Sequence, residues 1–227
     1  MNLKSDIDFK EYLKPTNYCD HNNKKIIAKV NELNKNDDSP KEKALSIFYF
    51  VRDKVKFMLN DFIKASEVLK RGNGDCGGKS NLQVALLRAA SIPARFHIFS
   101  LTKESLKGVV PNTIYKIMPL LIENHPCCEC YLSENWIACD TLFDKSLMQG
   151  FLKKEIYTKE QIPMIDWDGE NDLNTMVPWI IKDKGIYPSL DEIIDKAETQ
   201  SQDMPEDLKN MLTQKLTKHL EKLRNLR

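Results

Sequence analysis

One short segment constrains this chain more than any other: a turn crowded with glycine that runs directly into an apolar helix. The segment RGNGDCGGKS spans residues 71–80, and the apolar run LQVALLRAA follows it at residues 82–90. Glycine allows the sharp turn, so the pattern predicts a tight loop that leads into a buried helix, with Cys76 at the junction. At a helix start, backbone N–H groups and the positive end of the macrodipole favour a thiolate. A reactive thiol and a small buried cysteine are equally compatible with this segment alone.

The same segment does not fit a nucleotide-binding loop. The phosphate-loop motif G-x-x-x-x-G-K-[ST] would need a glycine five positions before Gly78, where the chain has Asn73. The stretch before the loop, VLKRG, also lacks the character of a buried strand. Nucleotide binding is therefore not predicted.

The surrounding sequence predicts an α+β fold, with helices first and an antiparallel sheet after them. Ser39, Pro40 and Glu42 form a capping box with proline in the first turn, which predicts a helix that starts there. The other elements are predicted from apolar periodicity. They are helices over 23–33 and 39–55, a strand over 95–101, and a hairpin of strands 125–132 and 135–142 with its turn at 133–134.

The C-terminal part contains two predicted helices, one starting near Ser189 and one running from Pro205 to about Leu226. The second carries a continuous apolar stripe, which we expect to pack on the core or on a second copy of the chain. The predicted division is a core over 1–185, whose motifs lie in 39–145, and a helical extension over 186–227.

A base for the thiol is offered by the hairpin. Of the four histidines, His125 lies at the start of the predicted strand, while His97 is predicted to be structural and His21 and His219 to be exposed. Strand alternation and a two-residue turn would bring His125 close to Asp140 on the partner strand. Cys76, His125 and Asp140 would then form a nucleophile, a base and an orienting carboxylate.

Three ordered segments resemble the transglutaminase-like family. They are EKALSIFYFVRDKVKF, KASEVLKRGNGDCGGKSNLQVALLRAASIPARF and HPCCECYLSENWIACDTLFD, and the resemblance covers roughly residues 12–145. It implies a papain-like core, with Cys76 as nucleophile, His125 as general base and Asp140 as orienting carboxylate. The family includes transglutaminases, cysteine peptidases and peptide N-glycanases. Where it commonly has an aromatic residue two positions after the histidine, this chain has Cys127, which would leave more room beside the histidine.

No cofactor or metal is expected. The six cysteines are predicted to be free thiols. A zinc site from His125 and the C-C-x-C run at 127–130 has the wrong spacing, and adjacent strand residues point to opposite faces. The acidic stretch 166–172 resembles a calcium loop, but Gly169 falls too early for that motif.

Composition excludes several classes of partner. Lys plus Arg number 34 and Asp plus Glu 33, a net charge of +1, which argues against nucleic-acid binding and suits a small or neutral substrate. The longest apolar run, residues 117–122, is too short to cross a membrane. The N-terminus lacks the apolar segment of a signal peptide, so a cytoplasmic protein is expected.

These observations favour an acyltransferase that works through an acyl-thioester on Cys76 and forms or cleaves amide bonds. The donor would be a small molecule or peptide, free or tethered to a carrier protein, and the acceptor an amine or water. The alternatives are a cysteine peptidase or amidase of the same fold, and a non-catalytic module that binds a partner through its C-terminal helices. A homo-oligomer formed through those helices is a further expectation.

Overall fold

Helices form the first half of the protein. The computed structural model describes residues 9–60, 63–200 and 205–226. A short 3-10 helix, η1 (Glu11–Leu13), precedes the first four α-helices and two very short strands, which are α1 (Lys24–Leu33), α2 (Pro40–Lys54), β1 (Lys56–Phe57), α3 (Ala65–Arg71), β2 (Asn73–Gly74) and α4 (Cys76–Ala89). The predicted helices over 23–33 and 39–55 are therefore confirmed, whereas α3 was not predicted.

The predicted start of α2 is confirmed in detail. Ser39 Oγ accepts the Glu42 N–H at 3.2 Å, and the Glu42 carboxylate accepts the Ser39 N–H at 2.9 Å. Pro40 occupies the first turn, where a missing N–H costs nothing. The capping box fixes where α2 begins.

A four-stranded antiparallel sheet follows, in the order β5-β4-β3-β6. Its strands and the helices between and after them are β3 (Ala94–Thr102), η2 (Lys103–Leu106), α5 (Asn112–Ile117), β4 (Leu121–Leu132), β5 (Asn135–Ala138), α6 (Lys145–Lys153), η3 (Val177–Trp179), β6 (Ile180–Tyr187), α7 (Asp191–Gln200) and α8 (Glu206–Arg224). This is the predicted α+β class with helices packed on an antiparallel sheet, and the predicted strand over 95–101 and both C-terminal helices are confirmed.

The predicted hairpin is present with two corrections. Its turn consists of Ser133 and Glu134, both with positive φ (49° and 66°), which is the backbone of a type I′ hairpin turn. However, β4 begins at Leu121, so His125 lies inside the strand and not at its start. Strand β5 ends at Ala138, and not at residue 142, because the following backbone pairs with a later segment around Leu173.

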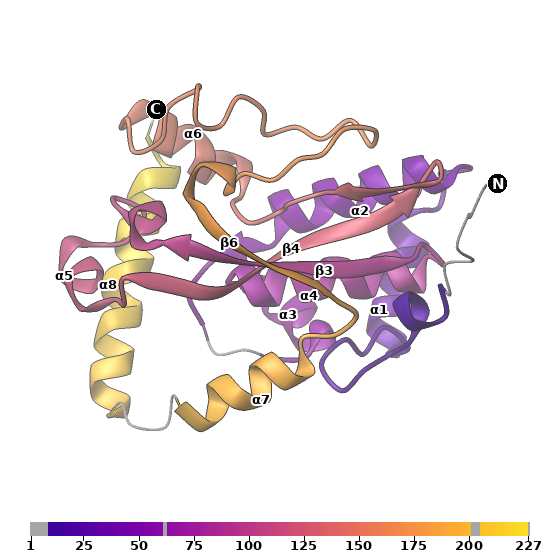
Figure 1. Ribbon diagram of the computed structural model, residues 1–227, viewed down its shortest axis with the longest axis horizontal. Coiled ribbons are helices and arrows are strands. Elements are labelled where there is room, and N and C mark those ends of the chain that lie inside the picture. Colours follow the sequence, from indigo (N-terminus) through magenta and orange to yellow (C-terminus); the bar gives the residue numbers. More distant parts are fainter. Residues whose placement is uncertain (1–8, 61–62, 201–204, 227) are drawn as a thin grey trace.

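Strand alternation separates two apolar cores. In the first, α4 packs against the sheet face that carries Phe96, Ile98 and Cys128. The second contains Phe99 and Cys127 and is closed by residues of α6 and α8. In Figure 1, α8 stands across one end of the sheet, on the side of the molecule away from the N-terminus.

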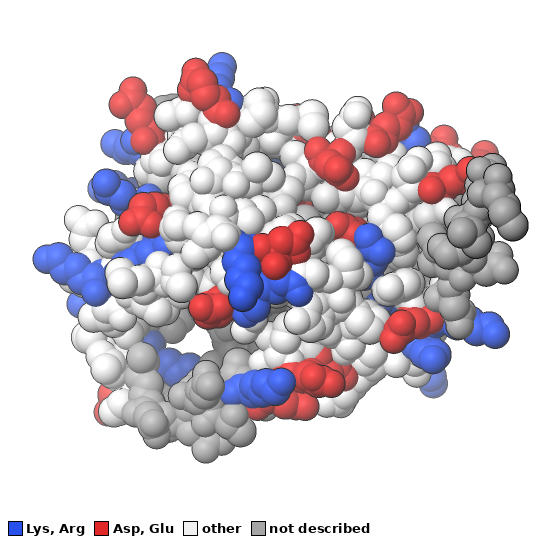
Figure 2. All heavy atoms as spheres, in the orientation of Figure 1, with Lys and Arg blue, Asp and Glu red and all other residues white. Residues whose placement is uncertain are grey.

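The stripe on α8 is only partly covered. Leu216, Leu220 and Leu223 are buried in the second core, whereas Leu208 and Met211 are 40% and 43% exposed. Among the residues that the structure describes, no helix combines the length and apolar character needed to cross a bilayer. Figure 2 shows acidic and basic side chains interspersed over the visible face, without a broad field of one sign.

Candidate active site

Cys76 is the first residue of α4, at the junction predicted from the glycine-rich turn. Helix α3 ends at Gly72, whose φ of 72° is a left-handed conformation that other residues adopt at a cost. Asp75 is the N-cap of α4, and its carboxylate accepts the Gly78 N–H at 2.7 Å. The local sequence therefore places Cys76 in the N-terminal turn of a buried helix.

The thiol does not have the lowered pKa expected from its position on the helix. Burial raises the pKa of Cys76, the charges of Asp75 and Asp140 raise it further, and a hydrogen bond from the Gly77 N–H opposes them. Burial also raises the pKa of Asp75 to about 6. Desolvation thus outweighs the macrodipole here, and Cys76 rests as a neutral thiol.

His125 lies in the interior of β4, opposite Phe99 of β3, and is 2% exposed. Its Nε2 is buried and has no hydrogen-bond partner among the described residues. Burial lowers the pKa of His125, and the charge of Asp140 opposes that shift. The imidazole is therefore a neutral base with an open nitrogen, influenced by the predicted carboxylate.

Asp140 lies on the same side of the hairpin as His125. The Cys139 N–H donates to the Cys128 carbonyl at 2.9 Å, which continues the ladder beyond β5 and sets Asp140 opposite Cys127. His125 is two residues further along that face of β4. The predicted proximity of His125 and Asp140 thus follows from the observed register, and the electrostatic effect of Asp140 on His125 agrees with it.

The hydrogen bonds of Asp140 differ from those expected. Its Oδ1 accepts the Leu142 N–H at 2.9 Å, and its Oδ2 accepts the Thr175 N–H at 3.2 Å and the Thr175 hydroxyl. Within the described residues, none of its hydrogen bonds comes from His125. Asp140 is 3% exposed, so this carboxylate is held in place by the backbone and by Thr175, and it acts on His125 through its charge.

Helix α4 is hydrogen-bonded to the segments that contain His125 and Asp140. Ser80 Oγ donates to the Pro126 carbonyl at 3.0 Å, beside the histidine. Gln83 Nε2 donates to the Cys139 carbonyl at 2.8 Å, and its Oε1 accepts the Thr141 hydroxyl at 2.8 Å. These two residues lie four and seven positions after the first residue of α4, on one helical face. Two polar residues on one face of an apolar helix are a sequence signal that could have predicted these hydrogen bonds. No comparable signal near Thr175 predicted its contact with Asp140.

Lys79 is a buried cation that supports α4 from behind. It is 0% exposed, and its Nζ donates to the Val55 carbonyl and, at 3.3 Å, to the Arg52 carbonyl at the C-terminal end of α2. Burial lowers the pKa of Lys79 to about 7, against the opposing charges of Asp144 and Asp140. It therefore caps α2 and does not point to a second reactive centre.

The other histidines do not join this site. His97 is structural as predicted, because its ring nitrogens lie 2.8 Å from the carboxylates of Glu129 and Asp183. His219 is not exposed as predicted: it is half-buried, and its Nε2 lies 2.8 Å from the Gly108 carbonyl oxygen. His21 is also half-buried, with its Nδ1 inaccessible.

The other five cysteines are all free and buried. Three of them form a thiol cluster in the first core, with the Cys139 sulfur 3.8 Å from that of Cys128 and 3.9 Å from that of Cys130. Burial raises the pKa of Cys139 well above its ordinary value, which suits a neutral, apolar side chain. Across residues 9–60, 63–200 and 205–226, no group of three or more His, Cys, Asp or Glu side chains is arranged to hold a metal ion.

Comparison with known proteins assigns the chain to a family. The pattern of the transglutaminase-like superfamily matches residues 27–141, which include all three predicted site residues. A crystal structure from Cytophaga hutchinsonii, described as a "Putative Cysteine Protease", shares 25% sequence identity, with a TM-score of 0.47. The match covers 61% of this chain and 43% of that one, so this chain spans less than half of that protein's length. None of the curated proteins matches. Because the matched region covers half of the chain, the protein belongs to the transglutaminase-like superfamily, a family of cysteine-dependent enzymes.

Proposed function

We propose that this protein is an acyl-transfer enzyme in which Cys76 is the nucleophile, His125 the general base and Asp140 the carboxylate that stabilises protonated His125. The observation that carries the proposal is that the hairpin register places Asp140 on the same face as His125 of β4, while Cys76 begins the helix that is bonded to this strand through Ser80. A buried histidine with an unpartnered nitrogen is suited to accept a proton, and a thiol at a helix start is suited to give one.

The reaction would begin from neutral groups. His125 takes the proton of the Cys76 thiol as the sulfur attacks an amide or thioester carbonyl carbon, and Asp140 stabilises the resulting imidazolium. The Cys76 backbone N–H offers one hydrogen bond to the developing oxyanion. When the tetrahedral intermediate collapses, the leaving group takes the proton from His125, and the acyl group stays on sulfur as a thioester.

The second half returns the enzyme to its starting state. An amine or water gives a proton to His125 as it attacks the thioester carbonyl, and the departing Cys76 sulfur then recovers that proton. An amine acceptor yields a new amide, and water yields an acid. We propose a small or carrier-tethered acyl donor and an amine acceptor, with hydrolysis as the competing outcome, because a net charge of +1 suits a substrate of low net charge.

The first experiment is alkylation of Cys76 by iodoacetamide, followed by peptide mass spectrometry. The other five cysteines are buried, so selective labelling of Cys76 would reflect access alone. The informative comparison is therefore the rate of Cys76 labelling in wild type against the rate in variants of His125 and Asp140. We expect His125→Ala and Asp140→Asn each to slow labelling of Cys76 by at least about tenfold, while Cys76→Ser abolishes it. Unchanged rates in both variants would contradict the proposal and favour a binding module.

The second experiment identifies the reaction. The protein is incubated with acyl thioesters or with peptides, each with and without a primary amine, and products are detected by mass spectrometry. The acyl-transfer proposal predicts an acyl adduct on Cys76 and an amide product that requires the amine. Cleavage of peptides without any amide product would instead assign a peptidase or amidase.

A further inference from the structure

A segment around Leu173 runs beside the residues at the end of β5 and just after it, Ala138 to Asp140. Asp172 Oδ1 accepts the Ala138 N–H at 2.8 Å, and the Leu173 N–H donates to the Ala138 carbonyl at 2.9 Å. The Asp140 N–H then donates to the Leu173 carbonyl at 2.8 Å. These bonds form a short parallel ladder, which replaces the end of the predicted strand over 135–142.

The next residue to reach the ladder is Thr175, and it bonds to a side chain. A regular parallel ladder would continue from the Thr175 N–H to a backbone carbonyl. Here that N–H lies 3.2 Å from Asp140 Oδ2, and the Thr175 hydroxyl donates to the same oxygen. Thr175 is 8% exposed and Asp140 3%, so little water competes for this carboxylate.

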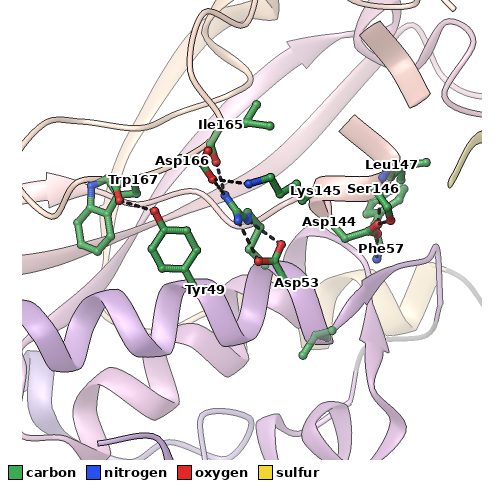
Figure 3. A network of polar contacts seen from close by, with 12 residues as sticks. Tyr49, Asp53, Phe57, Asp144, Lys145, Ser146, Leu147, Ile165, Asp166 and Trp167 are labelled. Carbon is green, nitrogen blue, oxygen red and sulfur yellow. Dashed lines mark hydrogen bonds and ion pairs between the residues drawn. The ribbon is translucent and has the colours of Figure 1, made fainter. Parts of the chain in front are cut away.

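The segment is anchored independently of the site. Arg52 of α2 donates to the Ile165 carbonyl and to the Asp166 carboxylate, both at 2.6 Å. The Tyr49 hydroxyl donates to the Trp167 carbonyl at 2.9 Å. Figure 3 shows these contacts joining the segment to the helix. Residues 165–167 are therefore held by α2, and residues 172–173 by the backbone around Ala138, independently of the bonds between Thr175 and Asp140.

We infer that Thr175 is a positioning residue of the active site, which holds Asp140 in the orientation that stabilises protonated His125. This inference rests on the proposed function. Thr175 lies outside residues 27–141, the region that matches the transglutaminase-like superfamily, so the family match alone does not include it in the site. Oδ1 of Asp140 is held by the Leu142 N–H, and Oδ2 by the Thr175 hydroxyl and the Thr175 N–H. Loss of the hydroxyl would leave Oδ2 with only the 3.2 Å bond from the N–H, so the carboxylate would be held less firmly.

The test measures the rate of Cys76 alkylation by iodoacetamide from pH 5 to pH 9 in Thr175→Val, Thr175→Ser and Asp140→Asn. Valine has the shape of threonine without the hydroxyl, and Thr175→Ala serves if valine does not fold. Thr16→Val is the matched control, because the Thr16 hydroxyl also donates to a carboxylate, that of Asp191, at 2.8 Å. Thermal unfolding of each variant reports structural damage separately.

We expect Thr175→Val to slow labelling on the order of tenfold, as for a lost hydrogen bond to a charged group. Thr175→Ser should restore the rate to within about twofold, and Thr16→Val should leave it unchanged. Because Asp140 raises the pKa of His125, a misplaced carboxylate should also move the acidic limb of the pH profile to lower pH. A purely structural role would not move that limb.

The outcomes separate the inference from the function on which it rests. If Asp140→Asn does not alter the labelling of Cys76, the proposed triad fails. If Asp140→Asn slows labelling but Thr175→Val and Thr175→Ala do not, the role of Thr175 is overturned and the triad stands. Failure of Thr175→Ser to restore the rate would also overturn the role of the hydroxyl.

Discussion

Arg224 should be one of the most sensitive positions for stability, because it fixes α8 to the rest of the molecule. Its guanidinium contacts both oxygens of Asp144, at 3.1 Å from Nε and 2.7 Å from Nη2, and it also donates to the Phe57 carbonyl at 2.8 Å. The side chains of Arg224 and Asp144 are each 4% exposed. Arg224→Ala would leave a carboxylate buried without its cation.

The magnitude follows from the buried pair. Burial alone would raise the pKa of Asp144, but hydrogen bonds and charge from Arg224 lower it from 3.8 to about 2. At about 1.4 kcal/mol for each pKa unit, this corresponds to about 2.5 kcal/mol of stabilisation of the charged carboxylate. Loss of one partner of a buried pair costs about 3–5 kcal/mol, because the remaining charge is uncompensated. For a protein of this size that lowers Tm by roughly 6–20 °C.

The pH dependence has a definite sign. The pKa of Asp144 is lower in the folded than in the unfolded protein, so its contribution is present above about pH 4 and is lost as the pH falls towards 2. The difference in unfolding free energy between wild type and Arg224→Ala should therefore shrink on acidification over that range.

The assay is urea unfolding followed by circular dichroism, in a double-mutant cycle with Asp144→Asn. Asparagine is an equally good N-cap, so it can still accept the Leu147 N–H that begins α6. Lys56→Ala is the control, because its ion pair with Glu221 is exposed and should be worth less than about 1 kcal/mol. A loss below about 1 kcal/mol for Arg224→Ala, or strict additivity in the cycle, would refute this account of the pair.

Three further predictions concern other positions. Gly150→Ala should destabilise the protein by about 1–3 kcal/mol in urea unfolding, because a Cβ there would overlap the Leu223 carbonyl oxygen and force α6 and α8 apart; no loss would show that the helices can separate freely. Lys79→Met should remove a rise in unfolding free energy of about 3–4 kcal/mol that wild type shows from pH 7 to 10. The rise is expected because the unfolded chain keeps this proton over that range, whereas the folded protein, in which the pKa of Lys79 is about 7, releases it; parallel pH curves would refute this. Replacing Ser133 and Glu134 by Asn and Gly should raise Tm by a few degrees, because both positions have positive φ, and an unchanged or lower Tm would count against the turn assignment.

Much of the site could be predicted because its determinants are local. The glycine-rich turn and the apolar run after it locate Cys76 at the start of a helix, and the period of two along the hairpin places His125 and Asp140 on one face. Neither inference needs knowledge of the rest of the fold. The end of β5 was less predictable, because the backbone at Asp140 pairs with Leu173, which lies 33 residues further along the chain.

The residues that support the candidate site were also hard to predict, because their partners are far away in the sequence. Ser80 and Gln83 are polar residues on one face of α4, but their partners lie on strands that the helix meets only in the folded protein. Thr175 lies 35 positions from Asp140 in a stretch without clear periodicity. No local pattern specifies which carboxylate such a hydroxyl will reach.

The sequence by itself determined the starts of α1, α2 and α4, the turn of the hairpin and the order of cysteine, histidine and aspartate, because capping and alternation depend on neighbours along the chain. Only the tertiary structure decided the state of those groups. Burial makes Cys76 a neutral thiol in spite of its helix position, and Asp140 is held by Leu142 and Thr175 while it influences His125 through its charge. Desolvation and long-range hydrogen bonds depend on what packs around a residue in space, and that is set by the whole fold.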